Sequence, residues 1–330
     1  MIVTIKNPVT IVKQGGGGGT ARPTTWAEFK NMTAAEQQAC YGIGDRAGLA
    51  CPYGSGDLLW EIGGWGTTRV ENDNTDYPCV ILVARLLPDQ TVQFDAPETP
   101  TAATEETAQE GIFYFGFDGT NYTALNLSTG DTIPYSDYTA VYKTDVTNNV
   151  TYYGQLRQFG YNDYYLSALR QWLNSDATAG NWWNASHVGD VAPSQASSTA
   201  GFMNGLPADF KAILSRTEVK TAGNRATVPT ATVKTSYDYF FCPSMYEVYG
   251  ASTPVEGDRI SYFAVNGSAK SGLRARGRID GGNTASAWLR SAIQGSANNA
   301  NYVISDGAAA SNAASVAFRA FVACKIILKS

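Results

Sequence analysis

Residues that could do chemistry are few and scattered in this chain. His187 is the only histidine, so a Ser-His-Asp triad or a histidine-based metal site would have to use it. No partner stands near it at a spacing typical of such sites. Glu105 and Glu106 form the one carboxylate pair, in a Thr/Ala-rich stretch that predicts an exposed loop with no apolar pocket to raise a pKa. We therefore expect no catalytic residue, no cofactor and no enzyme activity.

The sequence also lacks the patterns of metal and phosphate sites. Its five cysteines are odd in number and show no C-x-x-C spacing, which predicts buried thiols rather than ligands. They are Cys40, Cys51, Cys79, Cys242 and Cys324. Several aspartates stand beside glycines without the alternating spacing of a calcium loop. The glycine-rich segment 277–283 has no Walker or dinucleotide pattern and predicts a turn. We expect no metal.

Composition narrows the possible partners. Of 330 residues, 44% are hydrophobic, 12% aromatic and 16% charged, against about 25% charged in an average protein. The net charge of -5 and the lack of any Lys/Arg run argue against nucleic acid. The longest apolar runs, such as 80–84, are too short to insert in a membrane. Residues 1–6 do not resemble a secretory signal, so we expect synthesis in a cytoplasm. Nineteen Tyr and seven Trp favour recognition of a protein or a carbohydrate.

Two parts are expected along the chain. Residues 2–13 alternate apolar and polar side chains, and five glycines follow at 15–19. Residues 1–20 therefore predict a β-arm with a flexible linker, either disordered or docked on a neighbouring subunit. Residues 21–330 predict one domain, with an inserted loop and strand region at about 88–150 that begins with a Pro/Thr/Glu-rich stretch.

Helices are expected early in the domain and strands late. A capping box at Thr25 and Glu28 predicts a helix to about Ala39, and apolar spacing predicts helices at 163–174 and 207–216. β-Forming runs predict strands, which lie at 58–62, 79–87, 112–115, 139–143, 228–233, 238–242, 260–265, 273–276, 287–290, 302–305 and 317–327. This order favours an α+β fold over a βαβ repeat.

The segment near the C-terminus is the most distinctive. An Asn/Ser/Ala/Gly-rich tract at 295–315 lies between Trp288-Leu289-Arg290-Ser291 and the apolar run 316–322. Such a polar tract alone would not offset the roughly 1–2 kcal/mol per residue that ordering a chain costs. Pinned between two β-forming flanks, it predicts an ordered surface with replaceable side chains, which suits recognition better than catalysis.

Several motifs, in order, resemble a known family. They are Tyr165-x3-Leu169-Arg170-x-Trp172-Leu173-Asn174-Ser175, Gly201-Phe202-x2-Gly205-x4-Phe210-Lys211, Trp288-Leu289-Arg290-Ser291, Tyr302-Val303-x2-Asp306-Gly307 and Val316-Ala317-Phe318-Arg319-Ala320. Over about 21–328 the chain resembles the C-type-lectin-fold, formylglycine-generating-enzyme-like variable proteins of diversity-generating retroelements. The family ending is usually closer to Val-Arg-Pro-Ala, from which Phe318–Phe321 departs. Cys242 and Cys324 do not form the cysteine pair of the enzymes, so the resemblance implies no oxidase activity.

The resemblance implies a C-type lectin fold with short strands, two main helices and long loops. It further implies a phage receptor-binding protein, a tail fibre or tail-tip adhesin, that binds a bacterial surface protein or glycan. In such proteins adenine mutagenesis changes Asn codons while a framework stays fixed; an Asn-rich loop without diversification remains the alternative. The implied variable binding surface is Ser291, Ile293, Gln294, Ser296, Asn298, Asn299, Asn301, Tyr302, Ile304, Ala309, Ser311 and Asn312. The implied framework is Trp288, Leu289, Arg290, Gly307 and Arg319.

The expected setting follows from the same resemblance. The arm at residues 1–20 would attach the protein to other virion proteins, and avidity together with analogy to phage fibres favours a homotrimer. We expect the protein in the virion, in a phage tail or fibre, after synthesis in the host cytoplasm. The alternative function is a structural decoration of a capsid or tail without direct contact with the host.

Overall fold

A computed structural model describes most of the domain. Described are residues 21–85, 87–97, 160–186, 190–222, 233–250, 255–264, 283–293 and 299–330, with the backbone of strands within 113–153 and at 277–278. The arm at 1–20, the acidic pair Glu105-Glu106 and His187 lie outside the described residues, and so do the predicted strand at 273–276 and nearly all of that at 228–233.

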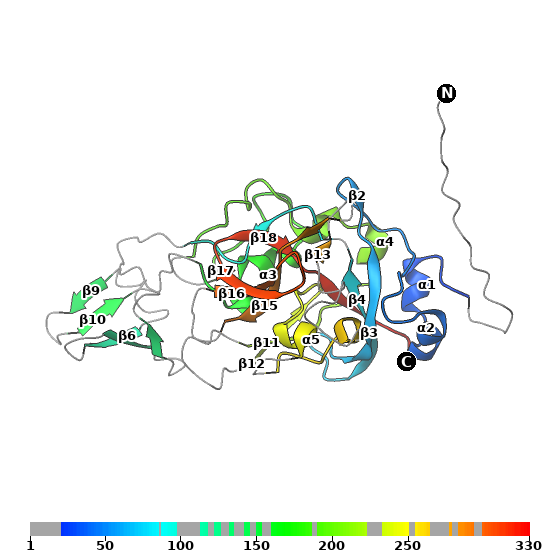
Figure 1. The fold of residues 1–330 in the computed structure, drawn as a ribbon, viewed down its shortest axis with the longest axis horizontal. Helices are drawn as coiled ribbons and strands as arrows, with labels where there is room; N and C mark the ends of the chain where they lie inside the picture. The colour runs from blue at the N-terminus through cyan, green and yellow to red at the C-terminus, as the bar shows by residue number, and fades with distance from the viewer. Residues whose placement is uncertain are drawn as a thin grey trace, which may run out of the picture.

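Two sheets form the centre of the molecule (Figure 1). One has three antiparallel strands in the order β19-β4-β3, and the other has five in the order β17-β16-β15-β18-β5. In the second sheet β15 and β18 pair in parallel, while the other neighbours are antiparallel. The strands are β3 (Trp60–Thr68), β4 (Tyr77–Ala84), β5 (Val92–Gln93), β15 (Ala287–Ala292), β16 (Asn299–Val303), β17 (Ala309–Ala313), β18 (Ala317–Ala320) and β19 (Ala323–Ile327).

The described part of the chain contains four further sheets. Three are two-stranded pairs, and a further five-stranded sheet has the order β8-β7-β6-β10-β9 within the predicted insertion. The pairs are β1 (Pro52–Tyr53) with β2 (Gly56–Asp57), β11 (Thr217–Ala222) with β12 (Val233–Asp238), and β13 (Gly277–Arg278) with β14 (Thr284–Ala285). The other five are β6 (Phe113–Phe117), β7 (Tyr122–Asn126), β8 (Thr132–Pro134), β9 (Tyr142–Asp145) and β10 (Val150–Tyr153).

All helices in the described part of the chain are short. The α-helices are α1 (Trp26–Lys30), α2 (Ala34–Cys40), α3 (Ala168–Leu173), α4 (Ala208–Lys211), α5 (Met245–Tyr249) and α6 (Ser261–Ala264). Two 3-10 turns, η2 (Tyr164–Leu166) and η3 (Phe202–Gly205), precede α3 and α4. The helix predicted from Thr25 starts there but ends at Lys30, because Thr33 caps a second helix with its own capping box to Glu36.

The predicted α+β class with a C-type lectin fold and two main helices is wrong. Strands account for 32% and helices for 17% of the structure, which is mostly β-sheet with several sheets and few helices. The apolar spacing of 163–174 suggested one long helix, yet Ser167 has an extended backbone and its side chain accepts a hydrogen bond from the Arg170 N–H as an N-cap. A capping side chain thus divides the segment into a 3-10 turn and a six-residue helix.

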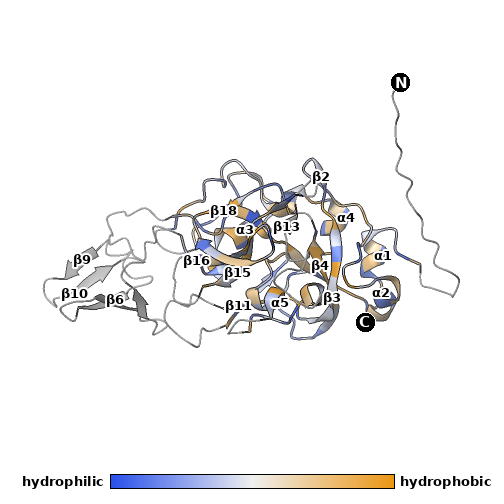
Figure 2. Ribbon diagram, in the orientation of Figure 1, coloured by the Kyte–Doolittle hydropathy of each residue, from blue (hydrophilic) through white to orange (hydrophobic). Residues whose placement is uncertain are grey.

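Other strands also differ from the prediction in their type or their boundaries. The segment predicted as a strand at 260–265 contains helix α6, and the strand predicted at 238–242 lies earlier, as β12. The run 317–327 is divided into β18 and β19, which belong to different sheets. By contrast, the continuous apolar run 80–84 forms most of β4, the middle strand of its sheet, as buried strands often do. Figure 2 shows β4 largely in hydrophobic colours and β16 with hydrophilic ones.

Packed aromatic rings join α3 and α4 to the three-stranded sheet. The ring of Trp60 on β3 lies 5.3 Å from that of Phe210 on α4 and 6.1 Å from that of Phe240. The ring of Phe202 lies 5.0 Å from Phe240 and 5.5 Å from Trp172 on α3. All five side chains are buried. At about 0.5–1.5 kcal/mol per aromatic pair beyond area burial, this cluster stabilises the packing of the helices on the three-stranded sheet.

Candidate functional site

The predicted binding tract forms neighbouring strands of one sheet. β16 pairs with β15 on one side and with β17 on the other, and β17 is the outermost strand. Asn301 lies opposite Ser311, and Tyr302 lies opposite Ala310. Tertiary pairing thus places residues some ten positions apart side by side. Gln294, Ser296 and Asn298 lie outside the described residues.

A cluster of aromatic side chains holds the strands of this sheet together. Trp288 is fully buried, and its indole N–H donates to the carbonyl oxygen of Val92 at 3.0 Å. Its ring lies 5.5 Å from Phe94 and 4.9 Å from Phe318. The Tyr302 ring stacks on Phe318 at 4.4 Å and remains partly exposed. Tyr302, predicted to bind a ligand, is therefore also part of the frame of the sheet.

Arg290 anchors β15 through a buried ion pair. Its guanidinium donates to Glu247 at 2.5 and 2.8 Å, to the Cys242 carbonyl at 2.8 Å and to the Lys220 carbonyl at 3.1 Å. Burial lowers the pKa of Arg290, but the charges of Glu247 and Glu256 outweigh it and leave that pKa above its ordinary value. The guanidinium stays charged and joins β15 to α5 and β11.

Glu256 extends this network. One carboxylate oxygen accepts the Ala222 N–H at 2.9 Å, the other accepts the Ser291 hydroxyl, and its carbonyl accepts from Arg290. Burial raises the pKa of Glu256, although Arg290 opposes this. Sequence reasoning missed both acids. Glu247 had a signal, because it closes a Ser-x-x-Glu capping box with Ser244 at the start of α5.

Two of the residues predicted to bind a ligand are instead buried supports. Ser291 is 3% exposed, and its hydroxyl also accepts the Met245 N–H at 2.9 Å. Asn301 is 7% exposed, and its amide donates to the carbonyls of Ser291 at 2.9 Å and Ala292 at 3.2 Å. These bonds lie where the β15–β16 register shifts, so Asn301 closes an irregularity in the ladder.

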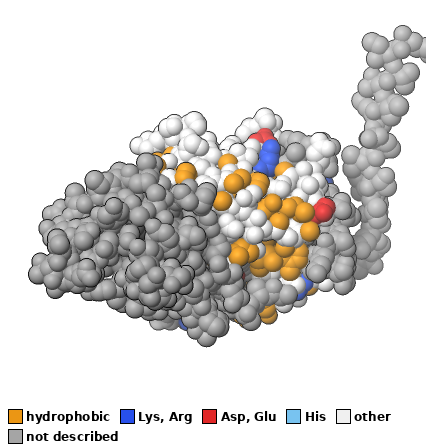
Figure 3. Space-filling view, turned by 60° about the vertical axis from the view of Figure 1, so that its left-hand side comes forward, with side chains coloured by type: hydrophobic (Ala, Val, Ile, Leu, Met, Phe, Trp, Pro, Cys, Tyr) orange, Lys and Arg blue, Asp and Glu red, His pale blue; other side chains and the backbone are white. Residues whose placement is uncertain are grey.

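The remaining predicted binding residues reach the surface to different degrees. Ala309 and Ser311 are exposed, while Ile293, Asn299, Tyr302, Ile304 and Asn312 are partly buried. The described side chains on the face shown in Figure 3 are largely apolar or uncharged, with few charged ones. None of the predicted binding residues on β16, β17 and the turn between them is charged.

The predicted framework residues lie where they can hold this surface. Leu289 is buried beside Trp288 and Arg290. Gly307, buried in the β16–β17 turn, has φ of 91°, and its carbonyl accepts the Tyr249 hydroxyl at 2.8 Å. Arg319 donates to the Pro88 carbonyl at 2.7 Å and pairs with Asp89 at 3.0 Å.

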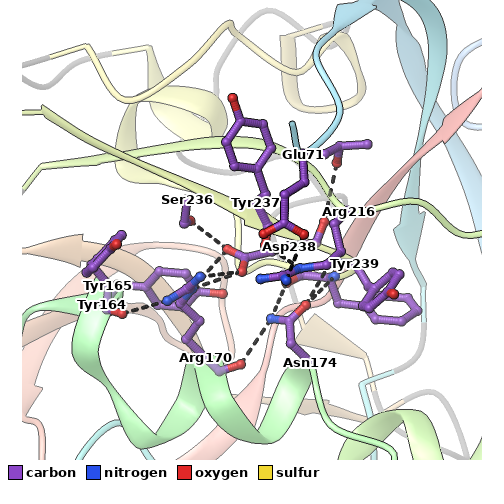
Figure 4. Close-up of polar contacts among 12 residues, drawn as sticks. Glu71, Tyr164, Tyr165, Arg170, Asn174, Arg216, Ser236, Tyr237, Asp238 and Tyr239 are labelled. Carbon is purple, nitrogen blue, oxygen red and sulfur yellow. Dashed lines mark hydrogen bonds and ion pairs between the residues drawn. The ribbon is translucent and has the colours of Figure 1, made fainter. Parts of the chain in front are cut away.

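A second polar cluster serves to fasten α3 to β12 (Figure 4). Arg170 donates to Asp238 at 2.9 and 3.1 Å, and Ser236 donates to the same carboxylate at 2.7 Å. The Asn174 amide bonds the backbone that follows β12, accepting the N–H of Tyr239 at 2.7 Å. Asp238 is 1% exposed and both its oxygens accept hydrogen bonds, so this carboxylate serves the fold.

Nucleophile and metal chemistry gain no support from the described residues. All five cysteines are free, and four are buried, as predicted. Burial raises the pKa of Cys51 and of Cys79 to about 11, so both are thiols at neutral pH and poor nucleophiles. Within the described ranges, no group of three His, Cys, Asp or Glu side chains is placed to hold a metal ion. Nor does the described part contain a helix of the length and hydrophobicity needed to cross a membrane.

Comparison with known proteins places the chain in a family. No curated protein and no solved structure gives a significant match. A family model described as "Domain of unknown function (DUF6273)" matches residues 136–326, which include α3, both polar clusters, strands β15 to β18 and all but the last residue of β19. Because that match covers more than half of the chain, the protein belongs to the DUF6273 family.

Proposed function

We propose that this protein is a receptor-binding module that recognises a bacterial surface protein or glycan through the β16–β17 surface. That surface is defined by Asn299, Tyr302, Ile304, Ala309, Ser311 and Asn312. The motif resemblance described above favours a phage particle as its setting, as a tail fibre or tail-tip adhesin.

The observation that carries the proposal is an unprotected sheet edge. β17 ends the sheet, and among the described residues only β16 pairs with it. Residues 308–314 contain neither a charged residue nor proline. Exposed edge strands usually carry such residues, which prevent pairing with other chains. β17 lacks charged residues and proline, and the buried Trp288 and Arg290 on β15 hold its sheet in place. Such an edge suits attachment to a partner.

The division between support and surface also favours diversification. Trp288 and Arg290 are buried and tightly bonded, so replacing them would disturb the fold. Ala309 and Ser311 are exposed and, within the described part of the chain, the Ser311 hydroxyl has no hydrogen-bond partner. Surface changes of this kind usually alter stability by no more than about 0.5 kcal/mol. We infer that a retroelement could vary these positions without unfolding the protein.

Cell binding tests the proposal. Fluorescently labelled protein is incubated with cells of the bacterium whose genome carries the gene, and bound fluorescence is measured by flow cytometry. The variant Ala309→Arg/Ser311→Arg adds two charges to β17. We expect it to lose at least about tenfold in apparent affinity, because buried unpaired charge at an interface costs several kcal/mol.

The matched control is Ser55→Arg. Ser55 is equally exposed but lies in the β1–β2 hairpin, outside the sheet that carries β17. This control should bind like the original protein, and all three should unfold at the same temperature. Equal binding by the β17 variant would refute the surface assignment. If no form binds cells but the β17 variant alone fails to self-associate, a structural role in the particle is the better explanation. A near-copy of the 288–324 coding segment beside a reverse transcriptase gene, differing at adenines, tests diversification separately.

A further inference from the structure

A cavity separate from the β16–β17 surface lies over the three-stranded sheet. Its volume is about 600 Å³, and β3, β11, β19 and the segment between α5 and α6 line it. Pockets of about 300–1,000 Å³ are typical of small-molecule sites.

Two glycines of β3 leave part of the cavity wall without side chains. Gly64 and Gly66 on β3 both line it. Gly64 has φ of 151° at the irregularity of β3, so its backbone requires glycine. Gly66 has no such requirement, and a Cβ atom added to it would meet no atom within 4 Å. A glycine inside a strand, with open space above it, is typical of a place where a ligand approaches the backbone.

A lysine at the same cavity has no carboxylate within ion-pair distance among the described residues. Lys325 on β19 lines the cavity, and its ammonium donates to the Glu218 carbonyl at 2.6 Å and to the Thr68 hydroxyl at 3.4 Å. It also lies 5.7 Å from the centre of the Phe241 ring. Burial lowers the pKa of Lys325. The negative charge of Glu247 acts against this decrease, and the positive charge of Arg290 adds to it. A desolvated ammonium of this kind gains from an anion placed beside it.

Most other charges around the cavity are already paired. Arg69 is bonded to Asp76 at 3.1 Å, Lys220 lies 3.2 Å from Glu218, and Glu247 is held by Arg290. Arg259 is the second cation, with no carboxylate within ion-pair distance among the described residues and with a buried Nε–H that lacks an acceptor. Its guanidinium packs so closely on Gly250 that a Cβ there would lie 1.5 Å from it. Asp258, an acid for which the described part of the chain offers no ion pair, is exposed.

We propose that this cavity binds a small hydroxylated carboxylate, of the class of the uronic acids, with its carboxylate at Lys325 and its body over Gly66. Lys325 and Arg259, for which no ion pair is found within the described ranges, favour an anion. The hydroxyls of Thr67, Thr235 and Ser261 on the walls favour a ligand with hydroxyl groups. The volume exceeds that needed by acetate or phosphate alone. The inference does not depend on the proposed receptor surface.

Titration calorimetry of the full chain with sodium D-glucuronate tests it, with D-glucose and inorganic phosphate as comparison ligands. Two variants act on the site by different means. Lys325→Met removes the ammonium but keeps an aliphatic side chain, and Gly66→Val fills the space over β3. The control Lys329→Met removes an exposed lysine from the same C-terminal segment.

We expect saturable glucuronate binding that weakens at least about tenfold in both site variants and is unchanged in the control. Gly66→Val should keep its thermal midpoint, so its loss of binding cannot be ascribed to unfolding. Absence of glucuronate binding, or equal binding by Gly66→Val, would overturn the proposal. Equal binding of glucose would exclude recognition of the carboxylate, and tighter binding of phosphate would exclude the uronic acid class. None of these outcomes bears on cell binding through β17.

Discussion

The buried pair between Arg290 and Glu247 should dominate the stability of the sheet that carries the proposed surface. Arg290→Met removes a guanidinium that is 1% exposed and leaves the Glu247 carboxylate, 6% exposed, without its counter-ion. Breaking one partner of a buried ion pair costs about 3–5 kcal/mol, because the remaining charge is desolvated and unpaired. We expect the free energy of unfolding to fall by that amount, as measured from urea denaturation at neutral pH.

A double-mutant cycle isolates the pair from the packing of each side chain. Glu247→Gln keeps an acceptor for the Ser244 N–H, with which Glu247 forms the capping box of α5 at 2.9 Å. In Arg290→Met/Glu247→Gln no charge is left unpaired between these two positions. The double variant should therefore lose less than the sum of the single variants, with a coupling energy of about 1–3 kcal/mol.

A surface ion pair supplies the control. Arg216 lies 2.8 Å from Glu71, but the two side chains are 41% and 36% exposed. Arg216→Met should cost no more than about 1 kcal/mol, since exposed pairs are screened by solvent. The reasoning would be refuted if Arg290→Met cost as little as this control, or if the losses in the cycle added within about 0.5 kcal/mol.

Two further predictions concern the same sheet. Because burial raises the pKa of Glu256 above 4.5, the folded state holds its proton more tightly than the unfolded state, so stability falls as pH rises from 4.5 through the raised pKa. Glu256→Gln should flatten that part of the profile of urea midpoint against pH; parallel profiles would contradict the assignment. Trp288→Ala should cost about 3–5 kcal/mol in the same denaturation assay because a fully buried indole leaves a cavity, whereas a loss under about 1 kcal/mol would show that the sheet does not rely on this ring.

Local signals in the sequence located several elements correctly. The apolar run at 80–84 became β4, the flanks of the polar tract became β15 and β18, and Thr25 capped a helix. Periodicity failed where a polar side chain competed with the pattern. Ser167 ended one turn and started the next, and 260–265, apolar enough for a strand, formed α6. The assumed fold failed for a different reason, because short motifs do not encode how sheets are assembled.

The sequence by itself determined that the 288–322 segment has apolar, β-forming ends around a polar tract whose side chains can be replaced. Both features follow from composition and local preference. Only the tertiary structure decided which polar residues face solvent. In the sequence, Ser291 and Asn301 resemble Ser311, which is exposed. In the structure both are buried: the Ser291 hydroxyl accepts the Met245 N–H, and the Asn301 amide donates to the β15 backbone. The same holds for Lys325, which reaches a cavity that distant strands enclose. Whether a polar side chain is buried depends on residues far away along the chain, and a local sequence pattern cannot predict which residues these are.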